Sequence, residues 1–572
     1  MKKLHQALIL IAIYVLSLGI RVFWLSQKEG LHVDEGLTIS LACYNNFMVT
    51  ENYEYGKKYT GKELKEASLV SDASLKGALA DVSNLWKDNR DPPHTNLYYT
   101  LLRLSLIGLK TGDIPSIILR GGILNLLFFT VSFIYFFLLM RLLFARSFLL
   151  QCAATLCAFM STAAISNTLF IRPYQIQETL FIIFCYYFVL SIGWRKFIIH
   201  ENNLFISVMP ILFMSLITAC TLLTGYYALL FVGLLGIYAI YLLCANKTYT
   251  EIPFYFVVLC FGILFAQILY PKYVSGFFSY RGQEAIKTIS GNVLENIRSS
   301  LAYAVTVLHK HFFSYPVIAV IVLCLAYLTV MFIREKKLSE IIPQLHDKKK
   351  STKPTIQKVA WYIFIASVVF LFMVLIIAPH KVLRYGMPVF PFLVIFPAML
   401  INSIWTQSRK IAACAMLLLC GCFALDAVKE SKIENIFRGK PNEYVFTQEK
   451  DTPVYVFNAA WSLWKYANLI PYVHDEQGYY FIDWYRYFDD YIKLDQKNAD
   501  VYLPEIEGHD AIYLLTEYIP EFPQLDGLIG LVAEKLQITN STVAGEFEIN
   551  TGEPESSFPY FKGKKIILHT PN

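Results

Sequence analysis

Long runs of apolar residues recur along this 572-residue chain, and they decide what it can fold into. A helix needs about 20 apolar residues to cross the hydrocarbon core of a bilayer. The composition agrees with such helices, since 56% of the residues are hydrophobic and the mean hydropathy is +0.45. The sequence predicts eleven spans, near residues 7–25, 115–140, 148–170, 176–193, 203–223, 226–244, 252–270, 313–333, 357–378, 386–404 and 410–427. We therefore expect a polytopic α-helical membrane protein.

Basic residues predict the orientation of these spans, because cytoplasmic loops carry an excess of Lys and Arg. The basic loops contain Arg141 and Arg146, residues 194–196, Lys247, residues 334–350, and Arg409 with Lys410. These loops alternate along the chain, so the predicted external segments are 28–112, 171–175, 271–312, 379–385 and everything after about 428. The first span lacks a signal-peptide cleavage site and is expected to stay as an anchor in the cytoplasmic (inner) membrane.

One apolar stretch in the large first external loop, residues 97–109, is too short for a span and carries Arg103. We interpret it as an interfacial helix or part of a hairpin. The later external segment 271–312 is long enough to be a lid over a site, although a passive surface loop is an equal alternative.

Charge divides the chain into two predicted domains. Residues 1–428 hold 21 acidic and 37 basic residues, whereas residues 429–572 hold 23 acidic and 13 basic residues. The acidic tail contains strand-like runs at 453–457, 511–515 and 565–568 and a helix-like stretch at 462–469, which together predict a small soluble α/β domain on the periplasmic side. Its aromatic run 479–486 fits either a carbohydrate-binding surface or the domain's core.

Several functions lose support from the motifs. Ten of the 11 cysteines lie in predicted spans, where thiols behave as small apolar side chains, so no disulfide framework is expected. The chain has no CxxC or HExxH pattern and no GxxxxGK[ST] loop, which argues against a zinc site, a metalloprotease and a P-loop ATPase.

Four polar segments lie in the predicted external loops. They are His32-Val-Asp34-Glu35, Asp91-Pro-Pro-His94, Arg172-Pro-Tyr174-Gln-Ile-Gln177 and His380-Lys381-Val-Leu-Arg384-Tyr385. Each alone also fits a structural role, as a solvated helix end, a stiff turn or cations that reach the headgroups. Because all four are predicted on one face of the bilayer, they can converge into a site where a carboxylate acts as a base and cations hold a phosphate.

The order and spacing of these motifs resemble the GT-C membrane glycosyltransferases, especially the bacterial relatives of protein O-mannosyltransferases and the lipid A aminoarabinose transferase group. The resemblance covers most of residues 1–430. The matching motifs are Asp34-Glu35, Pro92-Pro93 followed by Leu97-Tyr98-Tyr99, Arg172 with Tyr174, and Arg384-Tyr385-Gly-Met-Pro388 continuing to Pro391. Many relatives have His or Lys directly before the double proline, whereas here Asp91 precedes it and His94 follows.

The resemblance implies a GT-C fold and an inverting glycosyl transfer from a polyprenyl-phosphate donor to an acceptor hydroxyl on the outer face of the membrane. Asp34 would be the catalytic base and Glu35 a supporting carboxylate. The implied contacts to the donor phosphate come from Arg172, Tyr174, Lys381, Arg384, Tyr385 and His94. The residues expected to contact substrate from the loops are His32, Tyr98, Tyr99 and Arg281.

The expected partners are this lipid-linked sugar donor, a glycolipid, glycan or protein acceptor, and membrane lipids, with no nucleic acid. No obligatory metal or other cofactor is expected, although the paired acids with His32 leave a divalent cation open. The alternative class is a lipid or sugar transporter or flippase, which usually places ionisable groups near the bilayer midplane and often has internal repeats. An inactive scaffold that presents the acidic tail is a third interpretation.

Overall fold

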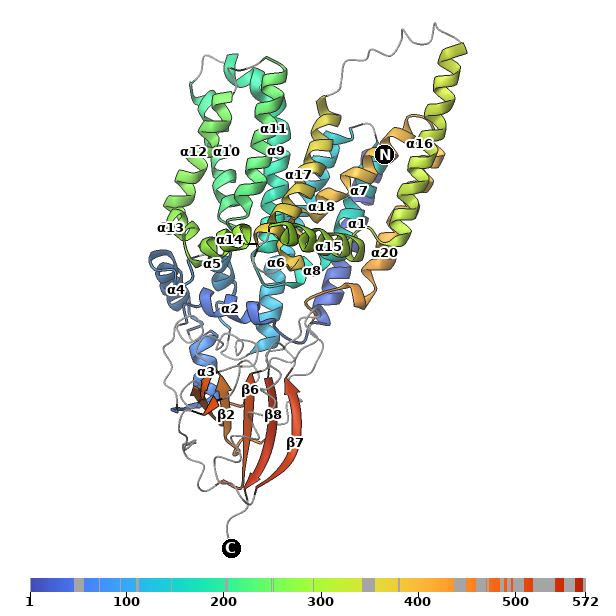
Figure 1. Ribbon diagram of the computed structural model, residues 1–572. Helices are drawn as coiled ribbons and strands as arrows, with labels where there is room; N and C mark the ends of the chain where they lie inside the picture. Colours follow the sequence, from blue (N-terminus) through green and yellow to red (C-terminus); the bar gives the residue numbers. More distant parts are fainter. Residues whose placement is uncertain are drawn as a thin grey trace. The chain divides into compact units, whose positions relative to one another are not determined.

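A computed structural model shows the fold of this protein (Figure 1). The residues that it describes are 2–45, 56–70, 72–92, 94–109, 113–145, 147–200, 204–247, 249, 252–291, 293–341, 355–378, 381–436, 449–458, 470, 473–483, 488–490, 495–496, 509–517, 541–549 and 561–568. Two compact units are present, each built from separate stretches of chain. The membrane unit comprises Met1–Trp24, Pro92–Tyr98 and Asn125–Glu434, and the sheet unit comprises Leu25–Asp91, Tyr99–Leu124 and Asn435–Asn572.

Long apolar helices account for the predicted spans. They are α1 (Lys2–Ser26), α6 (Ile114–Leu143), α9 (Tyr174–His200), α10 (Leu204–Leu222), α11 (Ala228–Ala245), α12 (Ile252–Leu269), α16 (Tyr315–Ile341), α17 (Thr355–Ile377), α18 (Phe390–Leu393) with α19 (Ile395–Trp405), and α20 (Arg409–Ala427). Among the described residues, nine segments are long and apolar enough to cross a membrane, and a bent pair raises the number to ten. The one remaining predicted span, 203–223, corresponds to α10, whose apolar part, Val208–Leu222, is shorter. The protein is thus a multi-pass α-helical membrane protein.

The span predicted at 148–170 is broken. Helix α7 (Phe148–Met160) and helix α8 (Thr162–Leu169) meet at Ser161 with a bend of 55°. The Ser161 hydroxyl caps α8 by accepting a hydrogen bond from the backbone N–H of Ala164. Every residue of α8 is buried, so this short helix lies inside the membrane unit rather than against lipid.

The segment predicted as the external loop 271–312 is mostly helical. It contains α13 (Tyr273–Phe277), α14 (Tyr280–Ser290) and α15 (Val293–His311). Leu294, Ile297, Leu301 and Val305 are all exposed on α15 at helical spacing, while Ser300, Ala304 and Val307 on the same helix are buried. An apolar exposed face of this kind is typical of a helix that lies in the membrane interface. The lid hypothesis stays a prediction.

The sheet unit contains a six-stranded sheet in the order β1-β3-β2-β6-β8-β7. Its strands are β1 (Lys58–Thr60), β2 (Val454–Asn458), β3 (Gly478–Asp483), β6 (Ala511–Glu517), β7 (Ser541–Ile549) and β8 (Phe561–Leu568), and β4 (Phe488–Asp490) pairs with β5 (Asp495–Gln496) separately. Strand β2 is parallel to β3 and β6, whereas β1, β8 and β7 pair antiparallel to their neighbours. The three predicted strand runs are confirmed, and the helix-like stretch 462–469 lies outside the described residues.

The core of this sheet contains aromatic side chains. Tyr479 and Tyr480 are 0% and 1% exposed, and the Tyr480 ring stacks on Tyr455 with centroids 4.8 Å apart. These two tyrosines of the run 479–486 are therefore core residues and not a carbohydrate-binding surface, while residues 484–487 lie outside the described part of the chain. Edge strand β1 comes from the first loop and pairs Tyr59 with Tyr479.

Four helices complete the first loop, α2 (Val33–Ala42), α3 (Gly61–Ser68), α4 (Leu75–Lys87) and α5 (Asn96–Ser105). Helix α5 is the stretch predicted as an interfacial helix or hairpin. Its Arg103 is fully buried, donates from Nε to Asp81 at 2.7 Å, and also donates to the Asp72 carbonyl. The Arg103 charge is thus buried with a partner inside the sheet unit, and this short apolar helix packs there without spanning a membrane.

Candidate functional site

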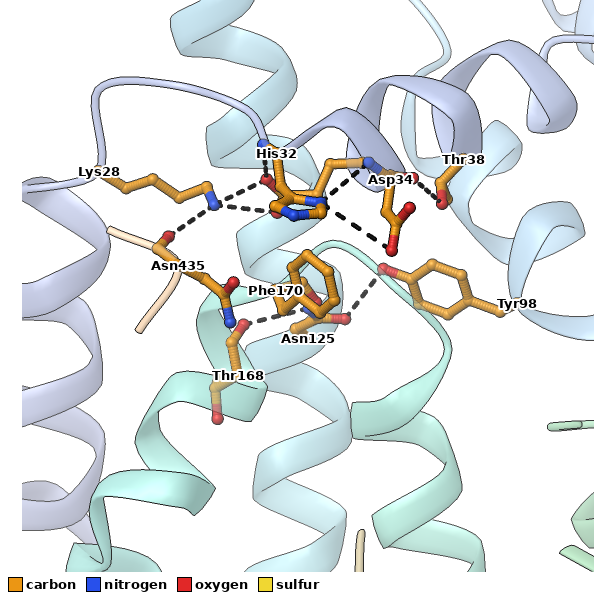
Figure 2. Close-up of polar contacts among 10 residues, drawn as sticks. Lys28, His32, Asp34, Thr38, Tyr98, Asn125, Thr168, Phe170 and Asn435 are labelled. Atoms are coloured by element: carbon orange, nitrogen blue, oxygen red, sulfur yellow. Dashed lines mark hydrogen bonds and ion pairs between the residues drawn. The ribbon is translucent and has the colours of Figure 1, made fainter. Parts of the chain in front are cut away.

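The acidic pair of the first loop lies in the first turn of α2, in the sheet unit. His32 is the N-cap residue, and its Nδ1 accepts a hydrogen bond of 2.9 Å from the Asp34 backbone N–H. Glu35 completes a capping box because its Oε2 accepts a bond of 2.6 Å from the His32 backbone N–H. Capping boxes satisfy backbone donors that a helix start leaves without partners. The structure thus uses His32 and Glu35 to begin the helix that carries Asp34. Figure 2 shows His32 and Asp34 at this helix start.

Glu35 is also half of a buried ion pair. Lys28 Nζ lies 2.9 Å from Oε1 and 3.0 Å from Oε2 of Glu35, and both side chains are 0% exposed. The same ammonium donates to the Asn435 carbonyl at 2.8 Å. Burial lowers the pKa of Lys28, and the Glu35 carboxylate opposes that shift. With both oxygens engaged, Glu35 suits a structural role better than a proton-transfer role.

Asp34 differs from Glu35 in its surroundings. Its side chain is 18% exposed, and its Oδ2 lies 3.9 Å from His32 Nδ1, beyond hydrogen-bond distance. Its backbone carbonyl accepts from Thr38 Oγ1 at 2.7 Å, as in a regular helix (Figure 2). The helix dipole also favours a negative charge in this first turn. Asp34 is therefore the acid of this pair whose carboxylate can reach another molecule.

The membrane unit brings two of the predicted cationic motifs together. Arg172 Nη2 lies 3.2 Å from His94 Nε2, and Arg172 is 8% exposed. A guanidinium only donates hydrogen bonds, so Nε2 is the acceptor and His94 carries its proton on Nδ1. In this arrangement His94 is neutral and orients Arg172, which keeps the positive charge. Pro93 lies outside the described residues.

Aromatic rings join the Arg172 segment to the Arg384 segment. The Tyr174 and Tyr385 rings meet edge to face with centroids 6.2 Å apart, and Tyr227 lies 5.6 Å from Tyr385. The Arg384 guanidinium carbon lies 5.7 Å from the centroid of the Tyr385 ring, within cation–π range. Three residues expected at the donor phosphate, Tyr174, Arg384 and Tyr385, thus belong to one cluster of the membrane unit, and Arg172 lies two residues before Tyr174 in the chain.

Lys381 is held by α15. Its Nζ donates to Asn296 Oδ1 at 3.0 Å, and the Asn296 amide nitrogen donates to the Ile376 carbonyl at 2.9 Å. The Asn296 amide is neutral, so this contact leaves the charge of the Lys381 ammonium available to an anion. His380 lies outside the described residues.

The remaining predicted residues are placed as follows. Tyr98 and Tyr99 are buried, at 1% and 0% exposure, so they do not present a surface to substrate in this conformation. Arg281 lies on α14, and its side chain is outside the described part. No group of three or more His, Cys, Asp or Glu residues suited to a metal ion occurs among the described residues. Because Asp34 belongs to the sheet unit and Arg172 to the membrane unit, their convergence stays a prediction.

Residues 92–98 are clamped to the ends of neighbouring helices. Tyr226 and Tyr270 both donate to the Pro92 carbonyl, at 3.3 and 3.1 Å, and Thr95 Oγ1 donates to the Leu223 carbonyl. At Gly276 an added Cβ would collide with both the Pro92 carbonyl oxygen and the Tyr226 hydroxyl. This close approach fixes the loop that carries His94.

We expect Gly276→Val to displace this loop, because its side chain has no space beside the Pro92 carbonyl. Overpacking of this kind costs about 1–3 kcal/mol, so the midpoint of thermal unfolding in detergent should fall. The matched control is Gly291→Ala, where an added Cβ meets neighbours only at ordinary distances of 3.5 Å or more. Equal midpoints for the two variants would contradict the clamp.

Sequence reasoning missed three residues that support this site, Lys28, Asn125 and Asn296. No sequence pattern distinguishes Lys28 from the other lysines and arginines of the loops. An asparagine in the middle of the apolar run 115–140 is a visible signal, since polar side chains inside spans usually have a specific partner. Asn296 lies in a segment that was expected to be a loop.

Comparison with known proteins identifies structural similarity alone. No protein-family model and no curated protein matches this chain. ArnT from Cupriavidus metallidurans bound to undecaprenyl phosphate has 10% sequence identity and a TM-score of 0.49, and the match covers 98% of this chain and 99% of that chain. ArnT from the same organism in the apo state has 10% identity and a TM-score of 0.46, with 100% of both chains covered. At 10% identity no residue's role carries over from these structures.

Proposed function

We propose that this protein is an inverting GT-C membrane glycosyltransferase. It moves a sugar from a polyprenyl-phosphate donor to an acceptor hydroxyl on the outer face of the cytoplasmic membrane. The acidic tail lies on the same, periplasmic side. The observation that carries the proposal is that His94 orients the Arg172 guanidinium, while Tyr174, two residues after Arg172, packs against Tyr385, whose ring also lies beside Arg384. This cluster of preorganised cations suits a phosphate leaving group.

In the proposed reaction, Asp34 takes the proton of the acceptor hydroxyl as its oxygen attacks the anomeric carbon of the donor sugar. The bond between that carbon and the phosphate oxygen breaks, and its electron pair leaves with the polyprenyl phosphate. Attack from the opposite side inverts the anomeric configuration. Arg172, Arg384 and Lys381 lie where negative charge develops on the leaving phosphate. They therefore stabilise the transition state more than they stabilise the bound donor before reaction.

We expect Arg172→Ala to weaken the binding of undecaprenyl phosphate by about 10- to 100-fold, because a charged hydrogen bond contributes about 1.5–3 kcal/mol. Binding is measured on purified protein in lipid nanodiscs, with undecaprenol as the uncharged ligand. Arg409→Ala, which removes an exposed cation at the start of α20, is the control and should bind as the unmodified protein does. Equal affinity of the unmodified protein for the two lipids would refute the phosphate site.

Transfer itself is tested by mass spectrometry of envelope glycans from a deletion strain, complemented with the full chain. Loss of a sugar from one glycan, restored by the chain, supports the transferase. Loss of a flippase would remove the same sugar, but the lipid-linked precursor would then accumulate on the inner leaflet, whereas loss of the transferase leaves precursor on the outer leaflet.

A further inference from the structure

Asn125 lies in the middle of the apolar helix α6 and is 0% exposed. Its amide nitrogen donates to two backbone carbonyls, Thr168 at 3.1 Å and Phe170 at 2.8 Å. Its amide oxygen accepts from the Tyr98 hydroxyl at 3.2 Å. Figure 2 shows this single amide joined to two other segments of the membrane unit, the end of α8 and the start of α5.

The two carbonyls belong to the end of α8, and a helix end leaves its last C=O groups without partners in the helix. No water is available in the hydrocarbon region to satisfy such groups, so another part of the protein must do so. Asn125 supplies both donors from α6. Any side chain without N–H groups at this position leaves these buried carbonyls without those bonds.

The Phe170 carbonyl also accepts a hydrogen bond from the Arg172 backbone N–H at 2.8 Å. This bond between residues i and i+2 closes a tight turn around Ile171, from which Arg172 emerges. Asn125 is thus separated from the Arg172 backbone by one shared carbonyl oxygen. A shift of that oxygen moves the start of the Arg172 side chain.

The third bond reaches the partner of Arg172. Tyr98 is four residues beyond His94 and lies in the first turn of α5, where its ring is buried. The Tyr98 hydroxyl is a fixed point for the segment 94–98, and Asn125 holds it. The same amide therefore fastens both chain segments that meet in the Arg172–His94 pair.

We propose that Asn125 is a positioning residue that sets the geometry of the Arg172–His94 pair toward a lipid phosphate. The proposal rests on the phosphate site of the proposed function. Asn125 does not touch the phosphate, and its effect is exerted through the Phe170 carbonyl and the Tyr98 hydroxyl. A misplacement of about 1 Å at a charged contact is enough to change function by about 10²-fold.

The test compares the affinities of Asn125→Leu for undecaprenyl phosphate and for undecaprenol in nanodiscs. We expect affinity for the phosphate lipid to fall about 10-fold or more, while affinity for undecaprenol stays within about twofold. A merely structural defect would lower both. The control is Ser132→Ala on the same helix, which removes the buried hydrogen bond of 2.8 Å between Ser132 and Thr179 of α9. This control should keep both affinities.

Two further variants test the bonds of the Asn125 amide nitrogen and amide oxygen separately. They also test the positioning role if Asn125→Leu does not fold. Asn125→Asp keeps the shape and the acceptor for Tyr98 but, as a carboxylate, donates to neither carbonyl, so it should lose phosphate affinity. Tyr98→Phe removes the third bond alone and should have a smaller effect. If Arg172→Ala loses phosphate selectivity while Asn125→Leu or Asn125→Asp keeps it, the positioning role is wrong. If the unmodified protein binds undecaprenyl phosphate no more tightly than undecaprenol, the phosphate site of the proposed function is wrong, whatever the role of Asn125.

Discussion

Asp34→Asn is expected to reduce sugar transfer by about 10²- to 10⁴-fold, the usual contribution of a positioned general base. Asparagine has nearly the same shape as aspartate but accepts no proton. The bonds that place Asp34 use its backbone N–H and carbonyl, through His32 Nδ1 and Thr38 Oγ1, so the substitution leaves them in place. The loss should therefore appear in turnover and not in the amount of folded protein.

The measurement is the product pattern of envelope glycans in a deletion strain that carries each variant at equal abundance. Asp88→Asn is the matched control, because Asp88 is another carboxylate of the first loop and its Oδ2 accepts from Tyr44 at 3.3 Å. It should restore the native pattern. Near-normal product from Asp34→Asn would remove Asp34 as the base and leave the cationic cluster without its assigned partner.

The membrane helices were predictable because the bilayer imposes one requirement on all of them, about 20 apolar residues with internal backbone hydrogen bonds. The break at Ser161 was not predictable from hydropathy, since residues 148–170 are apolar on both sides of it. A serine cap in such a run is a weak signal against a continuous span. Yet this break produces α8, and α8 ends at the turn that carries Arg172.

Edge strand β1 shows a second limit. Residues 58–60 form a three-residue strand, too short for a periodic pattern, and their partner Tyr479 lies more than 400 residues later in the chain. Only the paired backbone of β3 makes this segment extended. A sequence pattern indicates the local preference for strand or helix. It does not indicate which distant strand will pair with a given segment.

The acidic pair was found by its motif, and the resemblance assigned its members different roles, but their different surroundings were not predictable from the sequence. A capping box is usually recognised from Ser or Thr three residues before Glu, and here His32 takes that place. The role of Lys28 depends on a turn that brings its ammonium to Glu35 across seven residues. Two adjacent carboxylates thus look equivalent in sequence and have opposite surroundings in the fold.

Lys28→Met is expected to destabilise the protein by about 3–5 kcal/mol, the cost of leaving one charge of a buried pair without its partner. Both side chains of the Lys28–Glu35 pair are fully buried, so water does not replace the lost ammonium. The expected result is a lower midpoint of thermal unfolding in detergent and less folded protein in the membrane. Lys65→Met is the control, because the Lys65–Asp475 pair is partly exposed and such pairs contribute about 0–1 kcal/mol.

The double variant Lys28→Met with Glu35→Gln tests the physical reason. It removes both charges, and glutamine still accepts the His32 backbone N–H in a capping box. We expect it to recover most of the stability that Lys28→Met loses, because the large cost comes from an unpaired buried charge and not from the absence of the pair. Since it also preserves the helix start that carries Asp34, it should retain sugar transfer. A double variant less stable than Lys28→Met would contradict the unpaired-charge explanation. A double variant that is stable and inactive would show that Glu35 contributes its charge to the reaction and not only to the fold.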